Sequence, residues 1–167
     1  MKIFLINKLN GLAGVWQTMY VIKNLVENSV LNREIKDFAT SIVKDINPVD
    51  KKAQLQRIYS YLKPRYKYIS DYNGHEEVSA PLNMLKYLKE KGYFYGDCDD
   101  ATTFVLSLTK ALGFDSYMEV IGTKPNLYNH IRPYVIANGE RITLDLVGNS
   151  YFNKTTKSTM KPLLLKV

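Results

Sequence analysis

Residues 96–100, Gly-Asp-Cys-Asp-Asp, contain the only cysteine of this 167-residue chain and mark a change in its sequence pattern. A segment rich in glycine and tyrosine, residues 92–96, ends here. A run with helical i, i+3, i+4 periodicity follows and stops at Gly113, a residue typical of helix ends. Its apolar positions are Ala101, Phe104, Val105, Leu108, Ala111 and Leu112. The pattern predicts that Cys98 lies at or just before a helix N-terminus.

The surroundings of Cys98 set it apart from an ordinary core cysteine. A lone cysteine is most often a small buried apolar residue, but Asp97, Asp99 and Asp100 flank this one. The free N–H groups and the dipole of a helix N-terminus favour a thiolate. Like charge from the aspartates opposes it. We expect these three aspartates to set the local electrostatics, with Asp99 and Asp100 mainly capping the helix.

Bulk composition indicates one domain with an adequate core. The chain is 46% hydrophobic and 23% charged, both ordinary values for globular proteins. One cysteine excludes an internal disulfide and fits a reducing compartment. No apolar run approaches the roughly 18 residues that span a bilayer, and the run at residues 3–6 is too short for a signal-peptide core. We therefore expect a cytoplasmic protein without a membrane partner.

The formal net charge of +7 suits an acidic partner, but the distribution of the basic residues along the chain does not favour one. The basic residues are scattered, without a dense block or a nucleic-acid motif. Tyrosines and cations alternate over residues 59–72, a pattern that can bind single strands by stacking but also packs a core with polar tips near water. We favour packing and a solvated basic surface, so nucleic acid is not expected as a partner.

The predicted elements run from helices to strands. Helices are expected over residues 18–31, 33–46 and 48–62, the last with Asn47 as cap and Pro48 in first position. Residues 1–16 have no clear period and suggest an arm, and 65–80 look irregular. A short helix should start at Pro81 and end near Gly92. Strands are expected over 116–122, 130–137 and 141–147.

Helices followed by an antiparallel meander are typical of an α+β fold. We divide the chain into an N-terminal arm with helices packed on the core (residues 1–47), a catalytic core (48–152) and a basic C-terminal tail (153–167), all within one domain.

The last two predicted strands flank Asn138-Gly139, a strong hairpin signal. If the turn is centred there, the numbers of paired residues sum to 277, so that His130 faces Val147 and Arg132 faces Asp145. His130 and Asp145 then become diagonal neighbours on one face, about 7 Å apart at the backbone. The same register places a set of apolar residues on the opposite face: Ile131, Pro133, Val135, Ile142, Leu144 and Leu146.

Cys98, His130 and Asp145 together offer the parts of a cysteine nucleophile. Such a thiol needs a base, and the base needs an acceptor that orients it. The second histidine, His75, follows an expected turn at Asn73-Gly74 and is interpreted as an exposed loop residue.

A metal site built from Asp97, Asp99, Asp100 and His130 is the less favoured alternative. The glycine and distal glutamate of a calcium loop are absent, and one cysteine cannot build a thiolate zinc site. No metal and no cofactor are expected.

These residues carry a resemblance to a known group. The chain resembles the transglutaminase-like superfamily of papain-type cysteine enzymes, and most of all its bacterial and phage cysteine peptidase branch. The matching features are the motif at residues 96–100, His130 in a later strand, Asp145 within Leu-Asp-Leu (144–146), and the segment from Tyr66 to Pro81. The resemblance covers about residues 50–150 and implies a cysteine-bearing helix packed on an antiparallel sheet, with metal-free acyl transfer through a thioester.

Site roles follow from the resemblance. Cys98 would be the nucleophile, His130 the base and later the acid, and Asp145 the residue that holds the imidazole. The backbone N–H of Cys98 would donate to the oxyanion, and a second donor is expected upstream, with Tyr68 as candidate and Tyr72 as reserve.

Three functions stay open at this point. The first is a cysteine peptidase or amidohydrolase acting on a protein or peptide. The second is a protein-glutamine acyl transferase that passes the acyl group to an amine and cross-links chains. The third is a virion or assembly protein of a phage, associated with the virion in a host cytoplasm, that docks on other assembly proteins through residues 1–16 and keeps the fold with or without activity.

Overall fold

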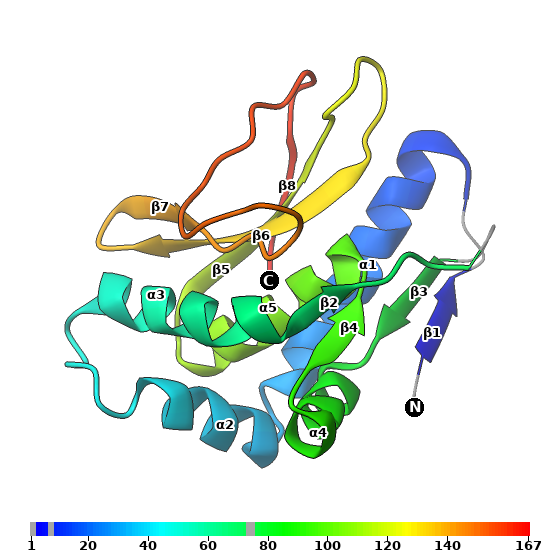
Figure 1. Ribbon diagram of the computed structural model, residues 1–167. Coiled ribbons are helices and arrows are strands. Elements are labelled where there is room, and N and C mark those ends of the chain that lie inside the picture. Colours follow the sequence, from blue (N-terminus) through cyan, green and yellow to red (C-terminus); the bar gives the residue numbers. More distant parts are fainter. Residues whose placement is uncertain (1–2, 7–8, 73–75) are drawn as a thin grey trace.

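The computed structural model describes residues 3–6, 9–72 and 76–167 and has the predicted α+β organisation (Figure 1). The expected turn at Asn73-Gly74 and His75 lie outside the described residues. The first half of the chain contains β1 (Ile3–Ile6), α1 (Gly11–Ser29), α2 (Arg33–Val43), α3 (Lys51–Leu62), the 3-10 helix η1 (Lys63–Arg65) and β2 (Tyr66–Tyr68). The second half contains β3 (Glu76–Ser79), α4 (Pro81–Lys91), β4 (Phe94–Gly96), α5 (Cys98–Ala111), β5 (Asp115–Ile121), β6 (His130–Ala137), β7 (Glu140–Thr143) and β8 (Leu163–Lys166).

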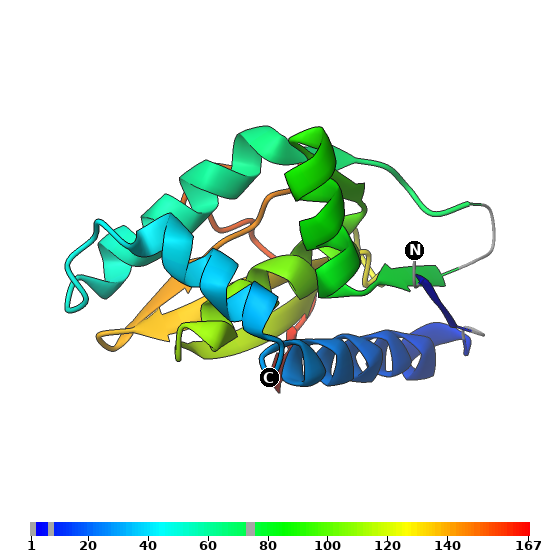
Figure 2. The same cartoon turned by 90° about the horizontal axis from the view of Figure 1, so that it is seen from below.

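Helix α5 lies at the centre of the molecule. It contacts α1, α2 and α4 as well as strands β3, β4, β5 and β6, and Figure 2 shows it enclosed between α1 and the other helices. Every residue from Asp99 to Thr109 is buried. A helix covered on all sides must satisfy its own polar groups. Thr103 and Ser107 do so by donating to the carbonyls one turn earlier, at 2.7 and 2.8 Å.

Two apolar clusters meet on α5. Phe104 and Leu108 join a cluster with residues from α2, α3, α4 and the β6–β7 hairpin. Leu106 joins a second cluster with Met19 and Ile22 of α1 and with residues of β5 and β6. The helix is therefore fixed from opposite sides by separate sets of contacts.

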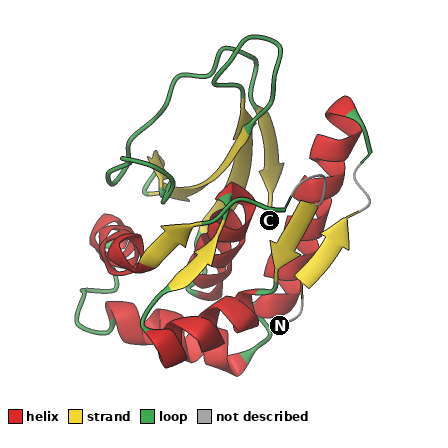
Figure 3. Cartoon of the chain, turned by 45° about the vertical axis from the view of Figure 1, so that its right-hand side comes forward, coloured by secondary structure: helices red, strands yellow, loops and turns green. Residues whose placement is uncertain are grey.

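The main sheet has the order β7-β6-β5-β8 and is antiparallel throughout. Figure 3 shows the strands stacked along one side of α5. The predicted hairpin is confirmed over β7. Ala137 pairs with Glu140 and Tyr134 with Thr143, so the residue numbers of each pair sum to 277. The turn residues Asn138 and Gly139 have positive φ angles of 52° and 78°, as this tight turn requires.

Strand β7 is shorter than predicted. It ends at Thr143, and the register continues for one more hydrogen bond, from Leu144 N to the carbonyl of Pro133 at 3.1 Å. The chain then turns, because Asp145 Oδ1 accepts the N–H of Val147 at 2.9 Å and the Ser150 hydroxyl donates to the Asp145 carbonyl. All the apolar residues assigned to one hairpin face are buried.

The N-terminal region differs from the expected arm. Residues 11–16 form the first part of α1, and residues 3–6 form β1, which pairs antiparallel with β3. Residues 66–68 and 76–79, expected to be irregular, are strands because β2 pairs with β4 and β3 pairs with β1. Each partner lies far away in the sequence, so local periodicity did not indicate the pairing.

Two other boundaries also differ. Helix α3 begins at Lys51 rather than at Pro48, because Asp50 is the cap and its Oδ1 accepts from Ala53 N at 2.9 Å. Asn47 instead accepts from Val49 N within the preceding turn. The expected C-terminal tail contains β8, which pairs with β5 as an edge strand. The helix from Pro81 to Gly92 is confirmed, with Gly92 in the left-handed conformation at its end.

Helix α1 is expected to be an integral part of the fold. Ile22 is fully buried in the second cluster, so Ile22→Ala should lower the free energy of unfolding by about 2–4 kcal/mol. Urea denaturation followed by circular dichroism measures this. Asn24→Ala, at an exposed position of the same helix, is the control and should change stability by less than about 0.5 kcal/mol. Equal effects of the two changes would contradict the packing of α1 on the core.

Candidate active site

The turn before α5 places Cys98 as the first residue of the helix. Asp97 is the N-cap, and its Oδ1 accepts from Asp99 N at 3.0 Å. Gly96 has a φ of 152°, and a Cβ atom there would collide with the Asp100 side chain. The chain therefore passes from β4 into α5 through a turn that needs glycine. The prediction that Cys98 lies at a helix N-terminus is confirmed.

Tyr66 holds this turn from β2. Its hydroxyl lies 3.0 Å from the carbonyl of Gly96 and 2.9 Å from that of Asp97, and it donates to them. Burial, together with the neighbouring Asp97, raises the pKa of Tyr66, so the phenol stays protonated. Sequence reasoning did not assign Tyr66 to the site. Its only signal was its place in the Tyr-Lys-Tyr segment upstream of the motif.

His130 and Asp145 are joined by a hydrogen bond. His130 Nε2 lies 2.7 Å from Asp145 Oδ2, and the two side chains are 14% and 9% exposed. The loop after Asp145 is held by Lys63, which donates to the carbonyls of Leu146 and Gly148, both at 2.6 Å. The predicted proximity of His130 and Asp145 is confirmed, and Lys63 is a supporting residue that sequence reasoning missed.

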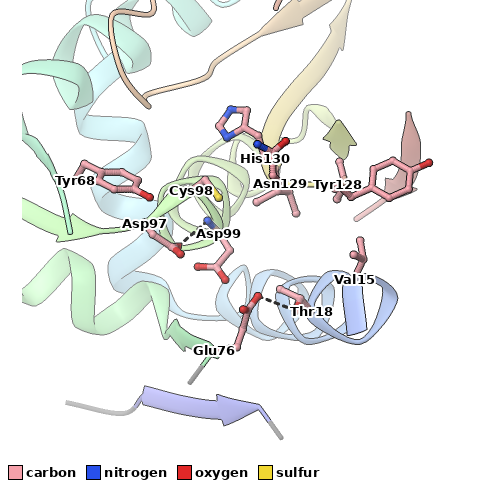
Figure 4. A pocket seen from close by; sticks show the side chains of 12 residues that line it. Val15, Thr18, Tyr68, Glu76, Asp97, Cys98, Asp99, Tyr128, Asn129 and His130 are labelled. Atoms are coloured by element: carbon pink, nitrogen blue, oxygen red, sulfur yellow. Dashed lines mark hydrogen bonds between the residues drawn. The ribbon is translucent and has the colours of Figure 1, made fainter. Parts of the chain in front are cut away.

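A cavity of about 220 Å³ is lined by five of the predicted site residues: Tyr68, Asp97, Cys98, Asp99 and His130. Figure 4 shows Cys98 and His130 on its wall, with Tyr68 to one side and helix α1 opposite. Asp145 does not line the cavity but is hydrogen-bonded to His130, which does. Tyr72, the reserve oxyanion donor, does not line the cavity and is 79% exposed. The lining consists of Val15, Thr18, Tyr68, Glu76, Asp97, Cys98, Asp99, Val120, Tyr128, Asn129, His130 and Ile131.

The environment of Cys98 disfavours its thiolate. Burial raises the pKa of the thiol most, and the charges of Asp97 and Asp99 raise it further. A backbone hydrogen bond from Ile131 acts in the opposite direction and lowers it. The expected opposition from neighbouring aspartates is therefore present, but loss of solvation is the larger cause.

Asp99 and Asp100 do not cap the helix, contrary to expectation. Asp97 takes that role. Asp99 is 2% exposed, and its Oδ1 has no hydrogen-bond partner among residues 3–6, 9–72 and 76–167. Burial and a hydrogen bond with the Asp97 carboxyl group raise the pKa of Asp99 well above its usual value. Asp100 instead accepts the N–H of Ser79 at 2.6 Å and so ties α5 to β3.

One group of carboxylates could hold a metal ion. Oxygens of Asp71, Asp97 and Asp99 lie within 4.8 Å of one another, and hard cations prefer such ligands. A proton shared among these carboxyl groups would also reduce the repulsion between their charges. Burial favours this, because it raises the pKa of Asp71 to about 6. This group differs from the alternative considered from sequence, since Asp100 is bonded to Ser79 and His130 to Asp145.

Asp100 should make stability depend on pH. Burial raises its pKa to about 7, although the bond from Ser79 N lowers it. A carboxyl group whose pKa is higher in the folded state costs stability as pH rises from about 4 to about 7, and the full cost remains above that range. Asp100→Asn keeps an acceptor oxygen, so it should stabilise the protein on the order of 2 kcal/mol at pH 8 and much less at pH 4.5.

Thermal denaturation at both pH values measures this effect. Asp45→Asn is the control, because Asp45 is exposed, and it should leave the pH dependence unchanged. A variant at position 100 that is less stable than wild type at both pH values would contradict a burial penalty on Asp100.

The acidic neighbours should slow alkylation of Cys98. Changing both Asp97 and Asp99 to Asn removes the charge that raises the thiol pKa, and asparagine still serves as an N-cap. The double variant should react with iodoacetamide about tenfold faster at pH 8 for each unit by which the thiol pKa falls. Intact-protein mass spectrometry measures the rate. The control changes the exposed Asp37 and Asp45 to Asn. A rate no faster than that of the control would exclude this electrostatic effect.

Comparison with known proteins supports the fold but no family. No protein-family model matches the chain, and a search of curated proteins found no match either. Two solved structures are similar. One is a "putative protease" from Parabacteroides distasonis, with a TM-score of 0.56 and 12% identity over 77% of this chain. The other is a "putative cysteine protease" from Cytophaga hutchinsonii, with a TM-score of 0.53 and 13% identity over 79% of this chain.

This chain spans only 26% and 46% of those two proteins, respectively. At such low identity, the likeness concerns the fold. The chain has the mixed helix and antiparallel-sheet architecture of these two structures.

Proposed function

We propose that this protein is a cysteine amidohydrolase, most simply a peptidase, in which Cys98 is the nucleophile. The observation that carries the proposal is the 2.7 Å bond between His130 and Asp145 at the edge of the cavity that Cys98 also lines. A thiol at a helix N-terminus and an imidazole oriented by a carboxylate are the parts that nucleophilic acyl transfer requires. The names of the two similar structures agree with this chemistry.

In this proposal the bond to Asp145 sets the His130 tautomer. The Asp145 carboxylate accepts the Nε2–H, so Nδ1 is the nitrogen that takes a proton. Because burial raises the pKa of Cys98, the resting nucleophile is a neutral thiol. The proton moves to Nδ1 as sulfur attacks the substrate carbonyl, so that the thiolate forms only when the substrate is present.

Attack produces a tetrahedral oxyanion next to the first turn of α5. The backbone N–H of Cys98 and the hydroxyl of Tyr68, which lines the cavity, are the proposed donors to it. His130 then returns its proton to the leaving amine, and the C–N bond breaks to give a thioester. Water, deprotonated by His130, attacks the thioester and releases the acid and the free thiol.

Access of water favours hydrolysis over transfer to an amine. Tyr68 is 54% exposed and Asn129 is exposed, so the cavity opens to solvent. An acyl transferase benefits from a site that excludes water from its thioester. One motive for the assembly role was a docking arm at residues 1–16, but residues 3–6 and 11–16 belong to β1 and α1.

Cleavage of a complex peptide mixture tests the proposal. Peptides from a proteome digest are incubated with the protein, and new termini are identified by mass spectrometry. Cys98→Ala should abolish cleavage, and His130→Ala should slow it by about 10²–10⁴-fold. Asp145→Asn should also slow cleavage, because the Nε2–H loses its charged acceptor.

Asp115→Asn is the matched control for Asp145→Asn and should cleave like wild type. Asp115 pairs with Lys166 on the surface and lies at the opposite end of the β5–β6 pairing from His130. The proposal fails if wild type makes no cut that Cys98→Ala lacks. Addition of a primary amine separates the two acyl-transfer functions, because amide products in place of acids would identify a transferase.

A further inference from the structure

We propose that the cavity beside Cys98 binds a cationic side chain of the substrate, a lysine or an arginine, through an acidic wall formed by Glu76, Asp97 and Asp99. This inference rests on the proposed function and adds a substrate class to it. It predicts a peptidase that selects basic residues next to the bond it cleaves.

The charge of the cavity is opposite to that of the chain. The protein carries a formal charge of +7, yet three carboxyl groups line this cavity, and no lysine or arginine lines it within residues 3–6, 9–72 and 76–167. His130, which also lines the cavity and can become a cation, is bonded to Asp145. Focused negative charge in a concave site attracts a cationic ligand.

Asp99 supplies the second, independent observation. Its side chain is buried, and its Oδ1 makes no hydrogen bond within the described part of the chain. A buried acceptor without a partner costs free energy. In Figure 4 the Asp99 carboxyl group points toward the cavity between those of Asp97 and Glu76, and both neighbours raise the pKa of Asp99. An ammonium or guanidinium group would supply the missing donor and favour the ionised form.

Glu76 forms the far side of the wall. It belongs to β3, and its Oε1 accepts from the Thr18 hydroxyl of α1 at 3.0 Å. This bond holds the carboxylate where α1 and β3 meet, across the cavity from His130 in Figure 4. The position suits a specificity residue, because it lies apart from the reacting thiol and imidazole.

The remaining lining fits the stem of a long basic side chain. Val15, Val120, Tyr128 and Ile131 contribute apolar surface. Lysine and arginine place their methylene groups along such surface while the charged end reaches polar partners. A metal ion would use carboxylates but would gain nothing from this apolar part. Asp71, the third member of the possible metal-binding group, does not line the cavity. A lysine or arginine side chain therefore fits both the acidic and the apolar parts of the lining, whereas a metal ion fits only the acidic part.

Binding can be measured without catalysis. Cys98→Ala protein in EDTA is titrated with Nα-acetyl-lysine amide and with Nα-acetyl-norleucine amide, which lacks the charge, and binding is followed by NMR chemical shifts. The lysine probe should bind at least about tenfold more tightly, as expected for a charge-assisted hydrogen bond. Adding Glu76→Gln or, separately, Asp99→Asn should weaken lysine binding about tenfold, with little change for norleucine.

Glu77→Gln is the matched control. Glu77 is the next residue of β3, carries the same charge, and does not line the cavity. It should bind the lysine probe like the parent protein. Equal binding of the two probes, absence of binding by both, or equal effects of the changes at positions 76 and 77 would overturn the inference.

The peptide-mixture experiment separates this inference from the proposed function. Cuts that depend on Cys98 should have lysine or arginine enriched at one fixed position, and Glu76→Gln should reduce that enrichment while cutting continues. Cys98-dependent cuts without a basic preference would overturn the inference and leave the peptidase. Selective lysine binding by a protein that makes no such cuts would overturn the peptidase and retain the cationic site.

Discussion

Burial of α5 on every side is the constraint on which the rest of the structure depends. A helix enclosed by two apolar clusters cannot rotate or slide without breaking contacts on both sides. The position of its first residue is therefore fixed by packing along its whole length. The cap by Asp97 and the bonds from Tyr66 then fix the turn that leads into it. Together these interactions fix the backbone of Cys98.

The same burial creates an electrostatic conflict. The beginning of α5 carries adjacent carboxyl groups in a poorly solvated region, and each raises the cost of ionising the next. Burial and the neighbouring carboxyl groups raise the pKa of Asp99 well above its usual value. The thiol is subject to the same penalty. A nucleophile in this setting depends on a base that takes its proton during the reaction, which gives the pairing of His130 with Asp145 its importance.

Sequence reasoning succeeded where the information was local. The helix that follows the cysteine motif and the hairpin register both come from short patterns, and the register alone placed His130 near Asp145. It failed where pairing joins distant segments, as for β1 with β3 and β2 with β4. It also assigned the cap to the wrong aspartates, because any of three adjacent carboxylates can cap a helix and only the backbone conformation decides. Tyr66 and Lys63 act through contacts about 30 and 80 residues away in sequence, which no local pattern reveals.

The two walls of the cavity come from different parts of the sequence. The thiol, the imidazole and its carboxylate lie within residues 50–150, the region that carries the resemblance. The opposite wall includes Val15 and Thr18 of α1, which lie outside that region. The Thr18 hydroxyl donates to Glu76 and so links α1 to β3. The cavity therefore joins the groups that are proposed to react to a wall formed by α1. Residues on α1 can change what enters the cavity without disturbing the groups that would react.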